Sequence, residues 1–197
     1  MTKITLLEQL KDFAERHTCD LLLPVQMEEE DETAPPNSPP TVYIPGLPEL
    51  RAYARKAPFI THEIVTGKDA AVQYPGGGKG VQSTAVVRTV FCVYHQDEQA
   101  GRLALLTLME RMRIGLLEEV VIGKQFKLDL DAGIEELVYP VNLSQTAISP
   151  FYLGEMLTTW KLPTIERTIA YGKDAIQFYG GGYPPDQRGR IRQDPET

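Results

Sequence analysis

The chain has 197 residues and a formal net charge of −7, from 27 acidic and 20 basic residues. This length favours one domain, or one domain with long appendages. The acidic balance argues against a protein whose main task is to bind nucleic acid phosphates. The two cysteines, Cys19 and Cys92, are too few for a disulfide framework. Neither a signal peptide nor an apolar run of membrane-spanning length is found, so we expect a soluble protein made in the cytoplasm.

The first predicted element is a helix over residues 5–17. Its apolar residues recur at helical spacing, and acidic and basic residues occupy the other side. A helix this short is marginal alone, so we expect it to pack against another part of the protein. The apolar residues are Leu6, Leu7, Leu10, Phe13 and Ala14.

An acidic and proline-rich stretch follows. Residues 28–32 are all Glu or Asp, and six of the 15 prolines lie between residues 35 and 48. Repulsion between like charges and the missing backbone donors of proline disfavour a core helix or a central strand here. We therefore expect a long extended excursion over residues 26–48, in an arm that continues to residue 57.

Two strands are predicted next, over residues 59–65 and 84–94. The second is β-branched or aromatic almost throughout. A glycine-rich connection over residues 74–80 suggests that the two strands form an antiparallel hairpin with a large tip.

Asp97 is a good N-cap for a helix that extends to about Glu119. One apolar face is expected to contain Leu103, Leu106, Met109, Met112, Leu116 and Val120, and Leu105, Leu108 and Ile114 widen it. That is more apolar circumference than one sheet face usually covers. A second buried contact, within the chain or between subunits, is expected.

Three more strands are predicted over residues 124–130, 134–139 and 151–162, the last ended by Pro163. The fold class is therefore α+β: an antiparallel β-sheet packed by the N-terminal helix and one long central helix. We expect four segments: residues 1–25 (helix and lead-in), 26–57 (acidic, proline-rich arm), 58–170 (core domain) and 171–197 (an exposed Gly/Pro/Arg tail).

The search for chemistry assigns no catalytic, cofactor-binding or metal-ligating residue. Gly76–Gly80 lacks the phosphate-loop spacing and precedes a β-rich segment, so we interpret it as a hairpin tip. Cys92 and His95 are three apart on a strand and should not converge. His17, His62 and His95 lack metal-ligand spacing. The acidic pairs Glu118/Glu119 and Asp129/Asp131 are interpreted as solvated charges.

Residues 86–169 resemble the tail terminator and neck proteins of tailed bacteriophages and prophages. The resemblance covers about 85 residues and is carried by LMERMR at 108–113 and by GEMLTTWKLPTIER at 154–167. The acidic, proline-rich arm and the arginine-bearing tail are outside that pattern.

The resemblance implies a structural virion protein and no enzyme: a homo-oligomeric ring, with six subunits expected, at the head-proximal end of the tail tube. Such a terminator ends tube polymerisation and contacts the tail tube protein and the head-tail connector, while DNA passes through without sequence-specific binding. It needs no cofactor and no membrane. One alternative is a head-completion or connector-adaptor protein of the neck. The other is a small-ligand enzyme that uses Gly76–Gly80, for which replacing Lys79 by alanine would abolish nucleotide or phosphate binding.

Overall fold

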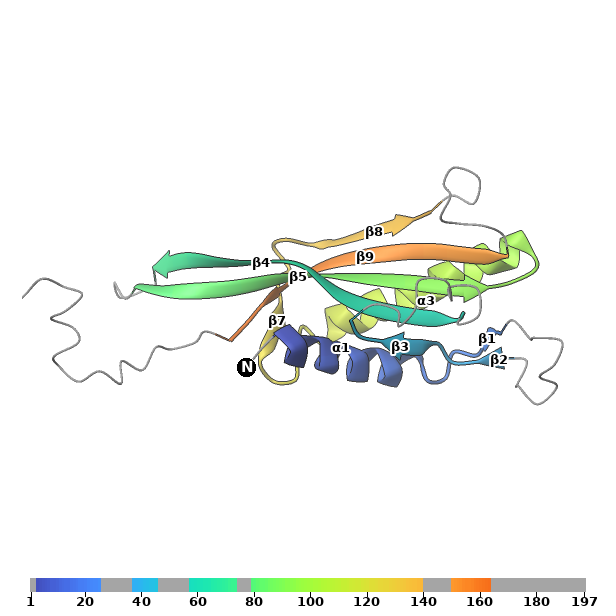
Figure 1. Ribbon diagram of the computed structural model, residues 1–197, viewed down its shortest axis with the longest axis horizontal. Helices are drawn as coiled ribbons and strands as arrows, with labels where there is room; N and C mark the ends of the chain where they lie inside the picture. Colours follow the sequence, from blue (N-terminus) through green and yellow to red (C-terminus); the bar gives the residue numbers. More distant parts are fainter. Residues whose placement is uncertain (1–2, 26–36, 46–56, 74–78, 140–149, 164–197) are drawn as a thin grey trace, which may run out of the picture. The chain divides into compact units, whose positions relative to one another are not determined.

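The computed structural model describes residues 3–25, 37–45, 57–73, 79–139 and 150–163. The rest of the predicted arm, the tip over residues 74–78 and the predicted C-terminal tail lie outside these residues. Within the described part the fold is α+β, as expected: two helices pack on a mostly antiparallel, curled β-sheet (Figure 1).

Helix α1 spans Lys3–Thr18 and α3 spans Glu98–Glu118. The small strands β1 (Leu23–Pro24) and β2 (Asn37–Ser38) pair with each other. The main sheet has the order β3-β4-β5-β9-β7-β6, and β8 also pairs with β9. Its strands are β3 (Thr41–Tyr43), β4 (Phe59–Gln73), β5 (Lys79–Tyr94), β6 (Val121–Ile122), β7 (Phe126–Leu128), β8 (Ile134–Val138) and β9 (Phe151–Lys161).

Strand alternation divides the sheet into two faces. In β9 the even-numbered residues from Tyr152 to Trp160 are buried and the odd-numbered ones are half-buried. The buried face packs against α1 and α3 in one core that includes Phe13, Val87 and Leu108. Trp160 is fully buried there, and its indole Nε1–H donates to Thr158 Oγ1 at 2.9 Å, so its polar group is satisfied.

Glycines permit close packing between the helices and the sheet. A Cβ on Gly101 of α3 would overlap the ring of Tyr152 on β9, and one on Gly154 of β9 would lie 2.6 Å from Met109 Sδ. A Cβ on Gly115 would lie 2.9 Å from His17 Nδ1 of α1. These positions need glycine for space, although glycine lowers the helix propensity of α3.

Two ion pairs fasten α1 and the turn after it to α3. Glu119, at the α3 C-cap, accepts from both terminal nitrogens of Arg16 at 3.0 and 3.1 Å and also contacts His17 at 3.2 Å. Arg111 donates to Asp20. Glu119 is therefore an interhelical partner, and the interpretation of this residue as a solvated charge was incomplete.

The N-terminal helix, the N-cap and the long last strand are confirmed. Asp97 caps α3 by accepting from the Ala100 amide at 2.7 Å. The predicted strand over residues 134–139 is present as β8, but that over 124–130 shortens to β7. Gly123 and Lys124 have φ of +55° and +61°, so a turn replaces the start of that strand.

The predicted buried face of α3 was wrong in part. Leu103 and Leu106 are 57% and 49% exposed, whereas Leu105 and Leu108 are buried. Two apolar stripes compete on this helix, and the side that contains Gly101 and Gly115 packs inward because it can approach its neighbours more closely.

Both hairpin strands extend further than predicted. β4 continues to Gln73, and β5 begins at Lys79, so Lys79 and Gly80 belong to a strand rather than to the tip. The added residues lack a strong apolar alternation because most of those in β4 are exposed and face no core. Backbone pairing, which leaves little trace in the sequence, holds them in place.

Part of the predicted arm belongs to the fold. β3 pairs in parallel with Phe59–Thr61 of β4, and its Val42 is buried. β3 is an edge strand, which agrees with the expectation that this stretch supplies no central strand.

Replacing Leu105 by alanine should lower the free energy of unfolding by about 2–5 kcal/mol, because it leaves a cavity in the core. The same change at exposed Leu103 should alter it by less than about 0.5 kcal/mol. Urea denaturation of both variants measures the difference, and equal losses would contradict this orientation of α3.

Replacing Gly101 by alanine should destabilise the protein by about 1–3 kcal/mol, because the new methyl group overlaps the buried Tyr152 ring. This loss exceeds the gain in helix propensity of about 1 kcal/mol. Gln99→Ala, at an exposed position of the same helix, is the control for urea denaturation. A Gly101→Ala variant more stable than the native protein would refute the close contact.

Candidate interaction surfaces

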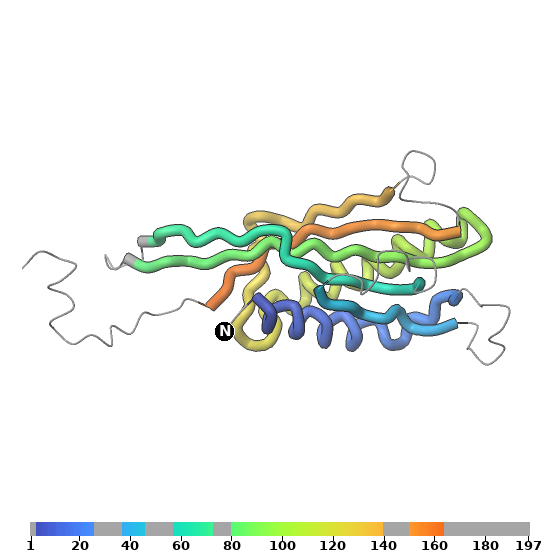
Figure 2. The backbone as a smooth tube through the Cα atoms, viewed as in Figure 1, coloured from blue at the N-terminus to red at the C-terminus, as the bar shows by residue number. Residues whose placement is uncertain are grey.

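The β4–β5 hairpin extends beyond the three-stranded part of the sheet. β9 pairs with β5 only from Thr84 to Tyr94, whereas β4 pairs with β5 from Lys79 onwards. Residues 69–73 and 79–83 therefore form a two-stranded ribbon, which is seen in Figure 2 as two tubes side by side beyond α1. Ala70, Ala71 and Val81 of this ribbon are exposed. Isolated two-stranded ribbons are marginally stable in water, so this segment is a candidate contact element.

A second candidate surface is the outward side of α3. Leu103, Leu106, Ile114 and Leu117 are each 43–57% exposed and recur at helical spacing. We call them the α3 stripe. Glu110 lies within the stripe, and its carboxylate is hydrogen-bonded by Arg113. The expected second contact of this helix is made with α1, through Gly115 and Glu119, and the α3 stripe is the side that neither the sheet nor α1 covers.

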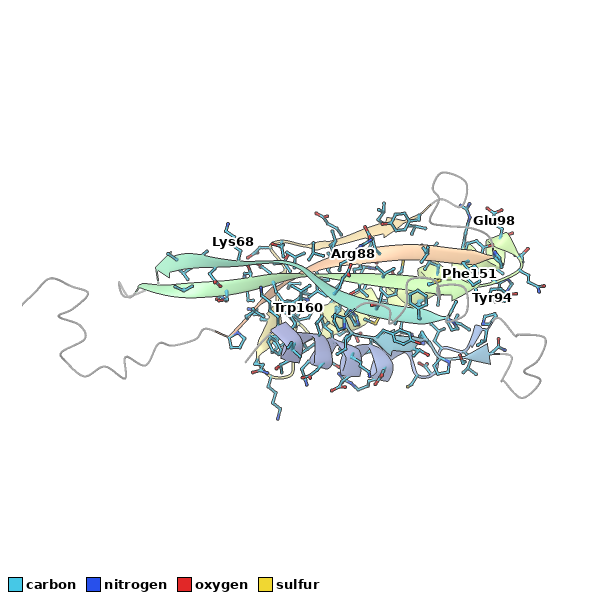
Figure 3. All side chains as sticks on the ribbon, in the orientation of Figure 1. Lys68, Arg88, Tyr94, Glu98, Phe151 and Trp160 are labelled. Atoms are coloured by element: carbon cyan, nitrogen blue, oxygen red, sulfur yellow. The ribbon has the colours of Figure 1, made fainter. Side chains whose placement is uncertain are left out.

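The sheet face opposite the helices, here called the open face, carries a charged cluster at its centre. Arg88 of β5 donates to Glu155 of β9 at 2.6 Å and to Glu63 of β4 at 3.1 Å (Figure 3). The hydroxyl of Tyr139 joins the cluster through Arg88 and Glu155, and burial raises the pKa of this tyrosine. Both carboxylates therefore form ion pairs with the Arg88 guanidinium.

Sequence reasoning missed this cluster. Its members are separated by up to 92 residues, and each looks like an ordinary polar residue on a half-buried strand. The register places Glu63 and Arg88 directly opposite each other, and Arg88 opposite Leu157, next to Glu155. Only the strand order and the register bring these charges together, so the sequence carries no local signal for the cluster.

Aromatic residues gather at one end of the open face. Tyr94 and Phe151, labelled in Figure 3, have ring centroids 5.5 Å apart. Tyr43 and Phe59 meet edge to face at 6.4 Å. These rings surround Cys92, and burial raises the pKa of its thiol to about 12. The thiol is therefore protonated at neutral pH and is a poor nucleophile.

Cys92 and His95 have different surroundings in the structure. His95 is half-buried at the end of β5, where its Nδ1 accepts from the Asp97 amide at 3.0 Å. The three histidines do not gather: His17 packs on Phe13 and Glu119, and His62 lies in the core. Among the residues that the structure describes, no group of three or more potential ligands could hold a metal ion.

Of the other predicted features, Asp129 is not a purely solvated charge. It forms an ion pair with Lys161 of β9 at 2.7 Å, and this contact raises the pKa of the lysine. Asp131, which lies 3.9 Å from the same lysine, is almost fully exposed.

Gly76–Gly78 lie outside the described residues. Lys79 and Gly80 begin a strand, whereas a phosphate loop leads into the N-terminus of a helix.

His62 is the one fully buried histidine in the described part of the chain. Its Nδ1 lies 2.9 Å from Thr89 Oγ1, and its Nε2 has no hydrogen-bond partner. Burial lowers the pKa of His62 to about 3, from an ordinary value of 6.5. The side chain is therefore neutral in the folded protein at neutral pH, and it fills space in the core rather than serving a site.

The chain matches no protein-family model and no curated protein in sequence comparisons. Among the helices of the described residues, none is both long enough and apolar enough to cross a membrane. The arrangement of the described surfaces, rather than a relative, therefore carries the functional argument.

His62 should make the protein sensitive to acid. Because its folded pKa lies below its unfolded pKa, the unfolded state binds the extra proton between about pH 6.5 and pH 3. The stability that this group supplies is complete above pH 6.5, and is lost by up to about 1.4 kcal/mol per pH unit as the pH falls through this window.

Urea denaturation between pH 7 and pH 4 measures this loss. The His62→Gln variant should show a shallower pH dependence than the native protein, because it removes the buried imidazole. Identical slopes for the native protein and His62→Gln would show that His62 is not buried in its neutral form.

Proposed function

We propose that this protein is a structural subunit of a tailed phage or prophage virion, a tail terminator. In this proposal six copies form a ring at the head-proximal end of the tail tube. The ring ends tube polymerisation and provides the surface on which the head connector docks. The resemblance of residues 86–169 to such proteins is the starting point, and the surfaces described above support it.

The observation that carries the proposal is that one chain leaves two different surfaces without a partner in its described part. They are the two-stranded ribbon and the α3 stripe. A cyclic ring with more than two subunits needs heterologous contacts, in which one surface of a subunit meets a different surface of the next. Two unlike contact surfaces on one subunit fit this requirement better than a single self-complementary patch.

The charges of the open face suit a channel through which DNA passes. Arg88 and Lys161 are both engaged by carboxylates, the first by Glu63 and Glu155 and the second by Asp129. Cations that are already paired in this way offer little to DNA phosphates. A ring that exposes this face to its channel would let DNA slide without gripping it.

The small-ligand enzyme has less support. Its candidate loop leads into strand β5, and no helix N-terminus follows to hold an anion. The buried thiol of Cys92 is protonated. The strand after the loop disfavours phosphate-dependent catalysis, and the protonated thiol disfavours a cysteine nucleophile.

The first test is the mass and position of the assembly. Native mass spectrometry at increasing concentration should reveal a species of six 22.0 kDa copies, about 132 kDa. Electron microscopy of virions or tail tubes mixed with the labelled protein should place it at the head-proximal tube end.

Three results would count against the terminator. A strictly monomeric protein without affinity for tube ends would overturn the ring proposal. Labelling of the connector but not of the tube end would replace it by the neck-adaptor role. Binding of ATP, GTP or phosphate in calorimetry, lost in Lys79→Ala, would favour the enzyme.

A further inference from the structure

The main sheet has two free strand edges at its opposite sides. β3 pairs only with Phe59–Thr61, so β4 has no second strand beside it from His62 to Gln73 within the described residues. On the other side, β8 pairs with β9 along one edge, and its second edge has no partner strand there. Free edges carry unpaired backbone donors and acceptors that can recruit another strand.

We propose that β8 of one copy adds to the free edge of β4 of the next copy. The sheet then continues from subunit to subunit. This inference rests on the proposed ring and adds a contact to those of the ribbon and the α3 stripe: a heterologous, strand-to-strand interface between two copies of this chain. Main-chain hydrogen bonds supply its affinity, as in other cases of strand addition.

Strand direction permits the pairing. β4 is antiparallel to β5, β5 to β9 and β9 to β8, so β8 runs antiparallel to β4 in the same chain. Rotation about a ring axis that runs along the strands preserves their direction. The β8 strand of the next copy therefore meets β4 in the antiparallel sense, and a closed ring leaves neither edge free.

The backbone of β8 has the required donors on its free side. The Tyr139 amide donates to the Leu153 carbonyl of β9 at 3.0 Å. The backbone amides of a strand point alternately to its two sides. The Leu137 amide therefore also faces β9, whereas the amides of Glu136 and Val138 face the free edge. The outward groups of β8 are thus available to an incoming strand.

The charges on the two edges are complementary. Lys68 lies opposite Thr84 of β5, and Glu135 lies opposite Leu157 of β9; both positions are on the open face. Lys68 and Glu135 are both exposed, and Lys68 stands out on the hairpin in Figure 3. A register that places Glu135 opposite Lys68 also places Glu136 opposite Gly67. The side chain of Lys3 lies over this glycine and so adds a second cation beside an acidic residue.

That register also brings a third strand up to the start of the ribbon. Residues 69–73 and 79–83 have no third strand in the described chain, and a two-stranded ribbon alone is marginal. With Glu135 opposite Lys68, β8 lies next to residues 65–69, so the first residue of the ribbon, Asp69, gains a neighbour in a third strand.

Disulfide trapping tests the contact in the full chain. In a Cys19→Ser background, with buried Cys92 retained, the pair Thr66→Cys and Leu137→Cys should form intermolecular disulfides under mild oxidation. The expected products are a ladder of covalent oligomers, and the largest contains as many subunits as the ring. Each single variant should give at most a dimer. Thr66→Cys with Val138→Cys is the matched control, because these two side chains lie on opposite faces and should not link.

A second variant tests the edge without cysteines. Val138→Pro removes an amide that faces the free edge and leaves the bonds to β9 intact, so the monomer should fold. Its assembly constant should fall at least tenfold, whereas Val138→Ala should assemble almost as the native chain does. Folding of both variants is checked by circular dichroism and urea denaturation.

The outcomes separate this inference from the proposed function. The strand pairing would be wrong if the protein forms rings, yet the Thr66→Cys/Leu137→Cys variant forms no intermolecular disulfide and Val138→Pro assembles as the native chain does. The terminator proposal would still stand after that result. A disulfide ladder in a protein that never labels tail or neck would support the pairing and contradict the proposed function.

Discussion

The length of β5 relative to its two neighbours is the constraint on which the rest of the structure depends. From Thr84 to Tyr94 this strand pairs on both sides, and its buried face supports the two helices. Among the described strands, only β4 pairs with its residues from Lys79 to Ser83, although the Leu162 amide also donates to the Ser83 carbonyl. One strand therefore produces both a well-packed core and an uncovered ribbon, and the boundary between them lies where β9 ends at Lys161.

Around the core end of β5, the two helices and the sheet pack at short distances from one another. Gly101, Gly115 and Gly154 remove side-chain volume where helix meets helix or sheet, and Tyr152 and Met109 occupy the space. This packing selects one of the two apolar stripes of α3 and turns the other outward. The exposed stripe is thus a consequence of how the buried one fits. It provides a second contact surface at a distance in sequence from the ribbon.

Much of the fold could be predicted from local patterns. The apolar spacing of residues 5–17 indicates α1, Asp97 marks the start of α3, and Pro163 follows the end of β9. These features depend on periodicity and capping, which act over a few residues. The outer halves of β4 and β5, the inward face of α3 and the Arg88 cluster were not predictable in this way. The outer halves of the two strands depend on backbone pairing, and the inward face of α3 depends on steric fit at its glycines. The Arg88 cluster depends on which strands are neighbours, and paired residues of β5 and β9 are up to 77 residues apart in sequence.

The sequence by itself determined the α+β class, the main helices and the central residues of the longest strands. It did so because alternation, helical spacing and capping are local. Tertiary structure alone decided that Leu105 rather than Leu103 faces the core and that Glu63 and Glu155 bracket Arg88. It also decided which two strand edges have no partner strand among the described residues. Those outcomes follow from steric fit and strand register, which are properties of the packed chain and are not encoded in any one segment.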